Sequence, residues 1–172
     1  FHTNRNFYRE RDGLRMGKVT YRAKVKLHGS CAAIQRLPDG SLEAMSREAM
    51  LSLESDNYGF ARWALGQTWP SLPAGVVLFG EWCGPKIQKG VAISKIPEKI
   101  FAVFAAQAVS PDGAYVPLVS EPAELAKLCE GVPNTYVLPW HGEPVVFDWH
   151  DGDESLTKVV DAINPMVEAV ET

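Results

Sequence analysis

Residues 31–47 read CAAIQRLPDGSLEAMSR and predict a β-hairpin. Cys31 to Leu37 is an apolar stretch, Pro38-Asp39-Gly40 has the composition of a tight turn, and Ser41 to Arg47 returns as a second strand. Upstream, residues 19–26 alternate strictly between apolar and polar side chains, which is typical of a half-buried strand. Strands joined by short turns are therefore the starting point of the fold.

Two further apolar runs predict buried strands. Residues 75–82 and 99–107 are rich in Val, Phe and Ile and are bounded by Gly, Pro or charged residues. A turn at Pro111-Asp112-Gly113 then directs the chain toward an extended segment at 114–119. Mostly antiparallel pairing is expected, because several of these segments follow one another through short turns.

Three helices are expected between and after these strands. Residues 56–68 carry apolar side chains at helical spacing behind Asp56 or Asn57, either of which is a good N-cap. A second helix is predicted from an N-cap at Ser120 to Gly131, and a third over 153–163, stopped by Asn164-Pro165. The resulting fold class is α+β, with mostly antiparallel sheets flanked by helices in one domain over residues 1–172.

Composition excludes several classes of protein. Of the 172 residues, 46% are hydrophobic and 22% are charged, and no run of eighteen apolar residues is present, so membrane-spanning, collagen-like and disordered chains are not expected. The three cysteines, Cys31, Cys83 and Cys129, are widely spaced and form neither a disulfide framework nor a C-x-x-C site. We expect a cytoplasmic protein without a membrane partner.

The net charge of -4 conceals a gradient along the chain. Residues 1–26 hold eight Lys/Arg and two Asp/Glu, whereas residues 110–172 hold two Lys/Arg and twelve Asp/Glu. A basic segment can contact phosphates whatever the overall charge, because only charges within a Debye length of roughly 8 Å affect a bound strand. The alternative is a basic terminus that is merely solvated.

Lys26 is the first candidate for chemistry. It begins the segment Lys26-Leu27-His28-Gly29-Ser30 at the expected end of a strand, and Gly29 allows a ligand to approach the backbone closely. A lysine amine is a nucleophile only when it is deprotonated, and positive charge from Lys24 would favour that form. The alternative is an ordinary solvent-facing lysine on the polar face of a strand.

A second cluster reads FGEWCGPKIQKG over residues 79–90. Glu81 stands at a predicted strand end, and the Gly-Pro turn that follows carries two lysines, an arrangement suited to holding a ribose hydroxyl beside phosphates. The spacing matches neither a P-loop nor a dinucleotide-binding glycine motif. Further on, the strand at 99–104 carries aromatic side chains that could stack on a base.

Taken in order, these segments resemble the ATP-dependent RNA ligases of the phage nick-sealing type, which belong to the covalent nucleotidyltransferase superfamily. Lys26-x-His28-Gly29-Ser30 resembles the nucleotidyl-lysine motif in its RNA-ligase version, where His replaces the Asp of DNA ligases and capping enzymes. Ser46-Arg47 resembles the arginine motif that follows, the 79–90 cluster the next motif, and 99–104 the aromatic strand after it. The resemblance covers roughly residues 18–107.

The resemblance implies an adenylation domain of ATP-grasp-like fold that joins RNA 5′-phosphate and 3′-hydroxyl ends in RNA repair. ATP and Mg²⁺ are the expected cofactors, and ATP and RNA ends the expected partners. Lys26 would form lysyl-AMP, and AMP would pass to the RNA before ligation. The nucleotide would be bound by these residues: Lys24, His28, Gly29, Arg47, Glu81 and Phe104. Gln88 and Lys89 would contact RNA or phosphate.

Several positions depart from the family pattern. Cys31 replaces a common Asn, Val25 an acidic residue and Ser46 a Lys. The two closing motifs of the family are not found, so we expect an adenylation domain that is incomplete at its C-terminal end and weak or inactive alone. Two alternatives stay open: a DNA ligase or capping-type nucleotidyltransferase, and a non-catalytic nucleic-acid-binding module on the same fold. The acidic run from Asp148 to Glu154 is interpreted as a solvated turn, not a metal site.

Overall fold

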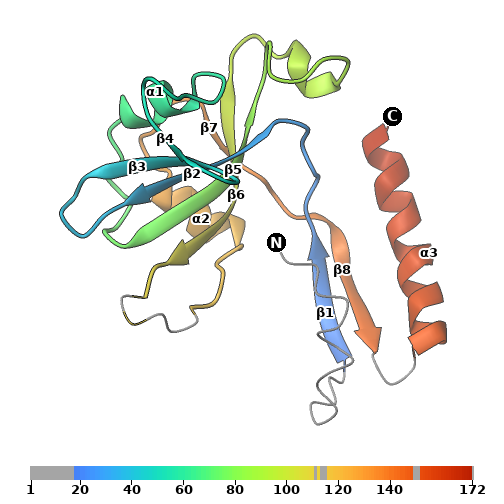
Figure 1. Ribbon diagram of the computed structural model, residues 1–172. Coiled ribbons are helices and arrows are strands. Elements are labelled where there is room, and N and C mark those ends of the chain that lie inside the picture. Colours follow the sequence, from blue (N-terminus) through green and yellow to red (C-terminus); the bar gives the residue numbers. More distant parts are fainter. Residues whose placement is uncertain (1–17, 111, 113–115, 149–151, 172) are drawn as a thin grey trace. The chain divides into compact units, whose positions relative to one another are not determined.

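The computed structural model describes residues 18–110, 112, 116–148 and 152–171 (Figure 1). The chain divides into two compact units, one formed by residues 1–25 with 140–172 and the other by residues 26–139. The single domain expected over residues 1–172 stays a prediction.

The larger unit contains a six-stranded sheet in the order β4-β3-β2-β5-β6-β7 (Figure 1). Its strands are β2 (Ser30–Arg36), β3 (Leu42–Ser46), β4 (Met50–Leu51), β5 (Val76–Cys83), β6 (Ile100–Ala108) and β7 (Thr135–Val137). All neighbours are antiparallel except β6 and β7. The predicted hairpin is confirmed as β2–β3, paired from Ala32↔Ser46 to Arg36↔Leu42. The α+β class with mostly antiparallel sheets is likewise confirmed.

Three short helices accompany this sheet: α1 (Phe60–Leu65), the 3₁₀ helix η1 (Ala92–Lys95) and α2 (Pro122–Leu128). Phe60 and Ala64 of α1 and Leu125 of α2 belong to one buried cluster with Ile34 and Leu78 from the strands. The two α-helices therefore pack on the same face of the sheet, and removing these side chains from water stabilises the unit.

An aromatic group forms the centre of this core. Phe60 lies 5.2 Å from Phe101 and 5.5 Å from Trp82 between ring centroids, and Trp63 lies 4.9 Å from Trp82. Rings at these separations add favourable edge and tilted contacts to their burial. The core thereby fixes the last residues of β5 and the first residues of β6 against α1.

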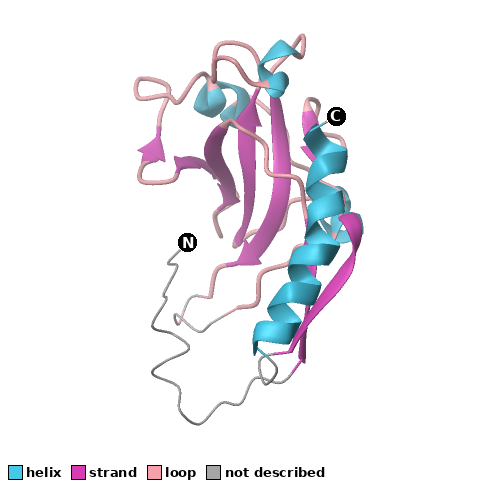
Figure 2. Ribbon diagram, turned by 90° about the vertical axis from the view of Figure 1, so that its right-hand side faces the viewer, coloured by secondary structure: helices cyan, strands magenta, loops and turns pink. Residues whose placement is uncertain are grey.

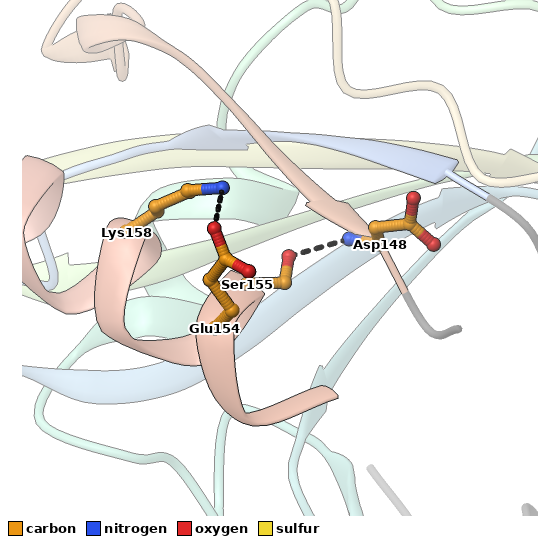
Figure 3. A network of polar contacts seen from close by, with 4 residues as sticks. All are labelled: Asp148, Glu154, Ser155 and Lys158. Carbon is orange, nitrogen blue, oxygen red and sulfur yellow. Dashed lines mark hydrogen bonds and ion pairs between the residues drawn. The ribbon is translucent and has the colours of Figure 1, made fainter. Parts of the chain in front are cut away.

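The smaller unit pairs β1 (Lys18–Ala23) antiparallel with β8 (His141–Asp148), and α3 (Gly152–Glu171) packs on β8 (Figure 2). The Asp148 backbone N–H donates to the buried Ser155 hydroxyl at 2.7 Å, and Lys158 pairs with Glu154 one turn along the helix at 2.7 Å (Figure 3). Asp148 and Glu154 thus belong to a strand and a helix, and residues 149–151 lie outside the described residues.

The helix boundaries correct three predictions. α1 is shorter than 56–68 and begins after Gly59, although the Asp56 carboxylate still accepts hydrogen bonds from the backbone N–H groups of Ala61 (2.7 Å) and Arg62 (3.1 Å). α2 has Glu121, not Ser120, as its N-cap, and Pro122 follows as a pre-organised first residue.

The predicted helix end at Asn164-Pro165 is wrong, because α3 continues to Glu171. Proline in a helix interior removes one backbone hydrogen bond, so the second half needs support from packing. His141 Nε2 donates to the Met166 carbonyl at 2.9 Å, and the absence of a side chain at Gly142 leaves room for Met166. These contacts hold the helix beyond the proline.

The first predicted strand ends earlier than expected. β1 stops at Ala23, the last residue with a partner on β8, so Lys26 lies in the following loop rather than at a strand end. The sequence did not predict β7 or β8. β8 contains Gly142 and Pro144, which are uncommon inside strands and are typical of loops. In the predicted segment 111–119, residues 111 and 113–115 lie outside the described residues, while Val119 bridges Ala106.

We expect Asp56→Ala to destabilise the larger unit by about 1–2 kcal/mol, because it removes the acceptor for the first N–H groups of α1. Urea unfolding followed by tryptophan fluorescence measures the loss. Glu48→Ala is the control, since it removes an exposed carboxylate and should change stability by no more than about 0.5 kcal/mol. Equal effects of the two substitutions would contradict the capping role of Asp56.

Candidate functional site

The loop between β1 and β2, residues 24–29, is attached to the sheet through Gly29. Its N–H donates to Glu81 Oε1 at 3.2 Å, and its carbonyl accepts from Gln88 Nε2 at 3.2 Å. The loop also carries Lys26 and His28, both exposed. Two side chains more than 50 residues away in sequence (separations of 52 and 59) therefore hold the backbone three residues after Lys26.

Only glycine fits at position 29. A Cβ there would lie 2.4 Å from the Trp82 carbonyl oxygen, 2.7 Å from Cys83 Sγ and 2.8 Å from Glu81 Cγ. The first of these neighbours is backbone in the middle of the sheet and cannot move aside. The sequence predicted that Gly29 lets a ligand approach the backbone closely, whereas in the structure the end of β5 makes the close approach.

Strand pairing aligns further site residues across the sheet. Cys31 on β2, Glu81 on β5 and Ala102 on β6 are successive partners, and paired residues project from the same face. Arg47 follows Ser46, the partner of Ala32, and so reaches the level of Cys31. None of these side chains belongs to the buried core cluster. They mark the face opposite α1 and α2, here called the open face because Cys31 and Glu81 are partly exposed on it, although Ala102 is fully buried.

The pKa values of Cys31 and Cys83 respond to the charged side chains near them. Burial and the Glu81 carboxylate raise the pKa of Cys31, and the Arg47 guanidinium opposes them. Burial, with a contribution from Glu81, raises the pKa of Cys83 to about 12, and the Lys26 ammonium lowers it. Lys26, Arg47 and Glu81 are thus close enough to influence neighbouring thiols, and the neutral thiol form of both cysteines dominates at pH 7.

Phe104 occupies an irregular position in β6. Pairing steps from Phe79↔Ala105 to Gly80↔Val103, so Phe104 is the extra residue of a β-bulge. A bulge re-aims a side chain relative to the regular strand. Phe104 is half-buried and is not among the residues packed on the core cluster, unlike Val103 beside it. Phe104, the predicted base-stacking residue, therefore lies outside the aromatic core.

The loop after β5 turns sharply toward the start of β6. Gly84 has φ 129°, and a Cβ there would lie 2.8 Å from Lys99 Cα, so the glycine permits this close approach. Gln88 and Lys89, predicted to contact RNA or phosphate, are exposed on this loop. Sequence reasoning missed the second role of Gln88, its hydrogen bond to Gly29, because no local pattern signals a contact of that range.

Lys24 is the one predicted site residue that belongs to the smaller unit. Its ammonium lies 4.6 Å from the centroid of the Trp140 ring, and the Arg22 guanidinium lies 4.9 Å from the same centroid. Both distances are within the range of cation–π attraction. The remaining predicted residues, all in the larger unit, are Lys26, His28, Gly29, Arg47, Glu81, Gln88, Lys89 and Phe104.

Comparison with protein families gives no match to any family model, and no curated protein matches the sequence either. Within the described part of the chain, no helix is long and apolar enough to cross a bilayer. The same residues contain no group of three or more His, Cys, Asp and Glu side chains arranged to hold a metal ion.

The charges around Cys31 predict opposite effects of two substitutions on its alkylation rate. Glu81→Gln removes a negative charge that raises the Cys31 pKa, so more thiolate forms and labelling at pH 8 becomes faster. Arg47→Gln removes an opposing positive charge and makes labelling slower. Iodoacetamide labelling followed by peptide mass spectrometry gives the rate at each cysteine.

Cys129 is the internal control, because burial alone raises its pKa to about 11 and neither substitution should alter its labelling. Rates at Cys31 that do not change, or that change in the same direction in both variants, would show that Arg47 and Glu81 do not flank this thiol as described.

Proposed function

We propose that this chain contains the nucleotide-binding sheet of an ATP-dependent RNA ligase with the nucleotidyltransferase fold, and that Lys26 is its nucleophile. The observation that carries the proposal is the attachment of Gly29 to Glu81 and Gln88. The sequence resemblance names the segments of Lys26, Glu81 and Gln88 as parts of one active site, although they are far apart in the chain. Their meeting at one end of the sheet supports that assignment.

In the proposed first step, the unprotonated Lys26 amine attacks the α-phosphorus of ATP. A nitrogen–phosphorus bond forms, the bond to the bridging oxygen breaks, and pyrophosphate leaves with the electron pair. The nitrogen loses a proton to solvent or to a nearby base. Lys26 suits this role because it is exposed, while Gly29 fixes the loop that carries it. Positioning of the reacting groups is the main source of catalysis in phosphoryl transfer.

Glu81 and Phe104 would hold the nucleoside. Glu81 Oε1 is engaged by Gly29, and among the described residues Oε2 makes no hydrogen bond, so it can accept one from a ribose hydroxyl. The half-buried Phe104 ring at the bulge offers a stacking surface for adenine. The hydrogen bond from Gly29 also fixes the Glu81 carboxylate, which reduces the entropic cost of binding the sugar.

Cationic side chains would hold the phosphates. Arg47 is exposed on the open face at the level of Glu81, and its planar guanidinium can donate two hydrogen bonds to a phosphate. His28 is exposed two residues from Lys26, and Lys89 is exposed on the loop after β5. Gln88 keeps a positioning role through its hydrogen bond to the Gly29 carbonyl.

The donor set fits a magnesium ion that arrives on the nucleotide rather than one held by a protein cage. The described residues contain no group of three or more His, Cys, Asp or Glu side chains that could hold a metal ion by itself. Mg²⁺ commonly binds through substrate phosphates together with one or two carboxylates. Glu81, the carboxylate that accepts from Gly29, could share it. When bound, the ion neutralises developing charge on the phosphate oxygens.

RNA is the proposed polynucleotide because His28 stands where DNA ligases and capping enzymes carry Asp. The later steps transfer AMP from Lys26 to an RNA 5′-phosphate, and a 3′-hydroxyl then displaces AMP as the phosphodiester bond forms. A DNA ligase or capping enzyme and a non-catalytic binding module remain the competing functions, and the assay below separates them.

The test is intact-mass measurement of the full-length protein after incubation with ATP and Mg²⁺. We expect a gain of one adenylyl group, which pyrophosphate reverses. Lys26→Ala should abolish the adduct, because it removes the proposed nucleophile. Lys127→Ala, which removes an exposed lysine on α2, should form it at the wild-type rate.

The acceptor then distinguishes the functions. Transfer of AMP to a 5′-phosphorylated RNA, with little transfer to the matched DNA, supports the RNA ligase. Preference for DNA or for a diphosphate RNA end supports the other enzymes. A wild-type protein that forms no adduct at any nucleotide concentration would overturn the proposed catalytic function.

A further inference from the structure

A strained turn at the same end of the sheet has no role in the function proposed above. Tyr58 has φ 54° and the following Gly59 has φ 84°, so both adopt the left-handed conformation immediately before α1. Glycine does so freely, but a bulky tyrosine does so at an energetic cost. Such strain persists only where surrounding contacts impose it, and it concentrates at binding sites.

Three side chains from the sheet impose this conformation. The Tyr58 carbonyl accepts hydrogen bonds from Lys99 Nζ at 2.5 Å and from Trp82 Nε1 at 3.2 Å. Asn57 Nδ2 donates to Ser30 Oγ at 2.6 Å. Ser30 follows Gly29 in the chain, Trp82 follows Glu81, and Lys99 directly precedes β6. The turn is therefore fixed to the residues that neighbour the candidate site.

The backbone is held inward while the ring points outward. The Tyr58 side chain is 50% exposed, and among the described residues its ring makes no aromatic contact and its hydroxyl makes no hydrogen bond. Phe60, two residues later, is instead fully buried in the aromatic core. Packing explains Phe60, but it does not explain why a strained position should carry an exposed aromatic ring.

We infer that Tyr58 is a stacking platform for an unpaired base of the RNA strand beside the end to be joined. This inference rests on the proposed function and names the part of the substrate that the turn would hold. Exposed aromatic rings bind single-stranded RNA by stacking on base faces, and a ring on a fixed backbone loses little entropy on binding. The Lys99 ammonium donates to the Tyr58 carbonyl and so places positive charge at the turn, which suits an adjacent phosphate.

The test measures binding of a 5′-phosphorylated single-stranded RNA to the full-length protein by fluorescence anisotropy, without ATP. Tyr58→Ala should weaken binding about 5- to 100-fold, the range expected for loss of one stacked base. Tyr58→Phe keeps the ring and should bind like the wild type. The ratio between Tyr58→Ala and wild type should not change with salt, because stacking releases no counter-ions.

Two variants separate stacking from stability. Tyr58→Asn should raise the thermal midpoint, because Asn tolerates positive φ, yet bind RNA as weakly as Tyr58→Ala. Tyr21→Ala is the matched control: it removes a comparably exposed tyrosine, 46%, from the regular strand β1 and should leave RNA affinity unchanged.

Wild-type affinity in Tyr58→Ala, an equal loss in Tyr21→Ala, or weakening of ATP binding in place of RNA binding would each overturn the inference. The proposed ligase activity is judged separately by the adenylyl adduct on Lys26, since RNA binding needs no adenylation. Either proposal can therefore fail without the other.

Discussion

The close approach of the Gly29 backbone to the end of β5 is the constraint on which the candidate site depends. At position 29 there is no space for a Cβ, and the peptide groups on both sides of that residue are occupied by Glu81 and Gln88. A loop carrying an exposed lysine would otherwise be free to sample many conformations, at a cost of about 1–2 kcal/mol per residue when a ligand orders it. The sheet has already fixed the Gly29 end of this loop.

The two faces of the six-stranded sheet have separate roles. One face carries the aromatic core and both α-helices, which fix β5 and β6 in position. The open face carries Cys31, Glu81 and, at its margin, Arg47. The hydrophobic core on the other face therefore supports the strands from which these side chains project. Trp82 links the core to the Tyr58 turn, because its ring packs in the core while its indole N–H donates to the Tyr58 carbonyl. Changes in core packing should therefore reach this turn through Trp82.

Local features of the fold could be predicted from sequence, and non-local ones could not. The β2–β3 hairpin follows from the Pro38-Asp39-Gly40 turn, whereas the pairing of β1 with β8 joins residues from opposite ends of the chain. The continuation of α3 past Pro165 depends on His141, which no helical pattern includes. Likewise Glu81 was identified from its motif, but the hydrogen bonds that tie it to Gly29 and tie the Tyr58 turn to the sheet are set by tertiary contacts alone.

Amide hydrogen exchange in Gly29→Ala tests the attachment of the loop most directly. The wild-type amide at residue 29 should be protected by its bond to Glu81, and the added methyl group should expel the loop from the end of β5. We predict faster exchange at residue 29, with the amides of the β2–β3 hairpin from Ala32 onward unchanged. Protection of residue 29 that equals that of the wild type would contradict the account, because the loop would then sit on β5 without needing glycine.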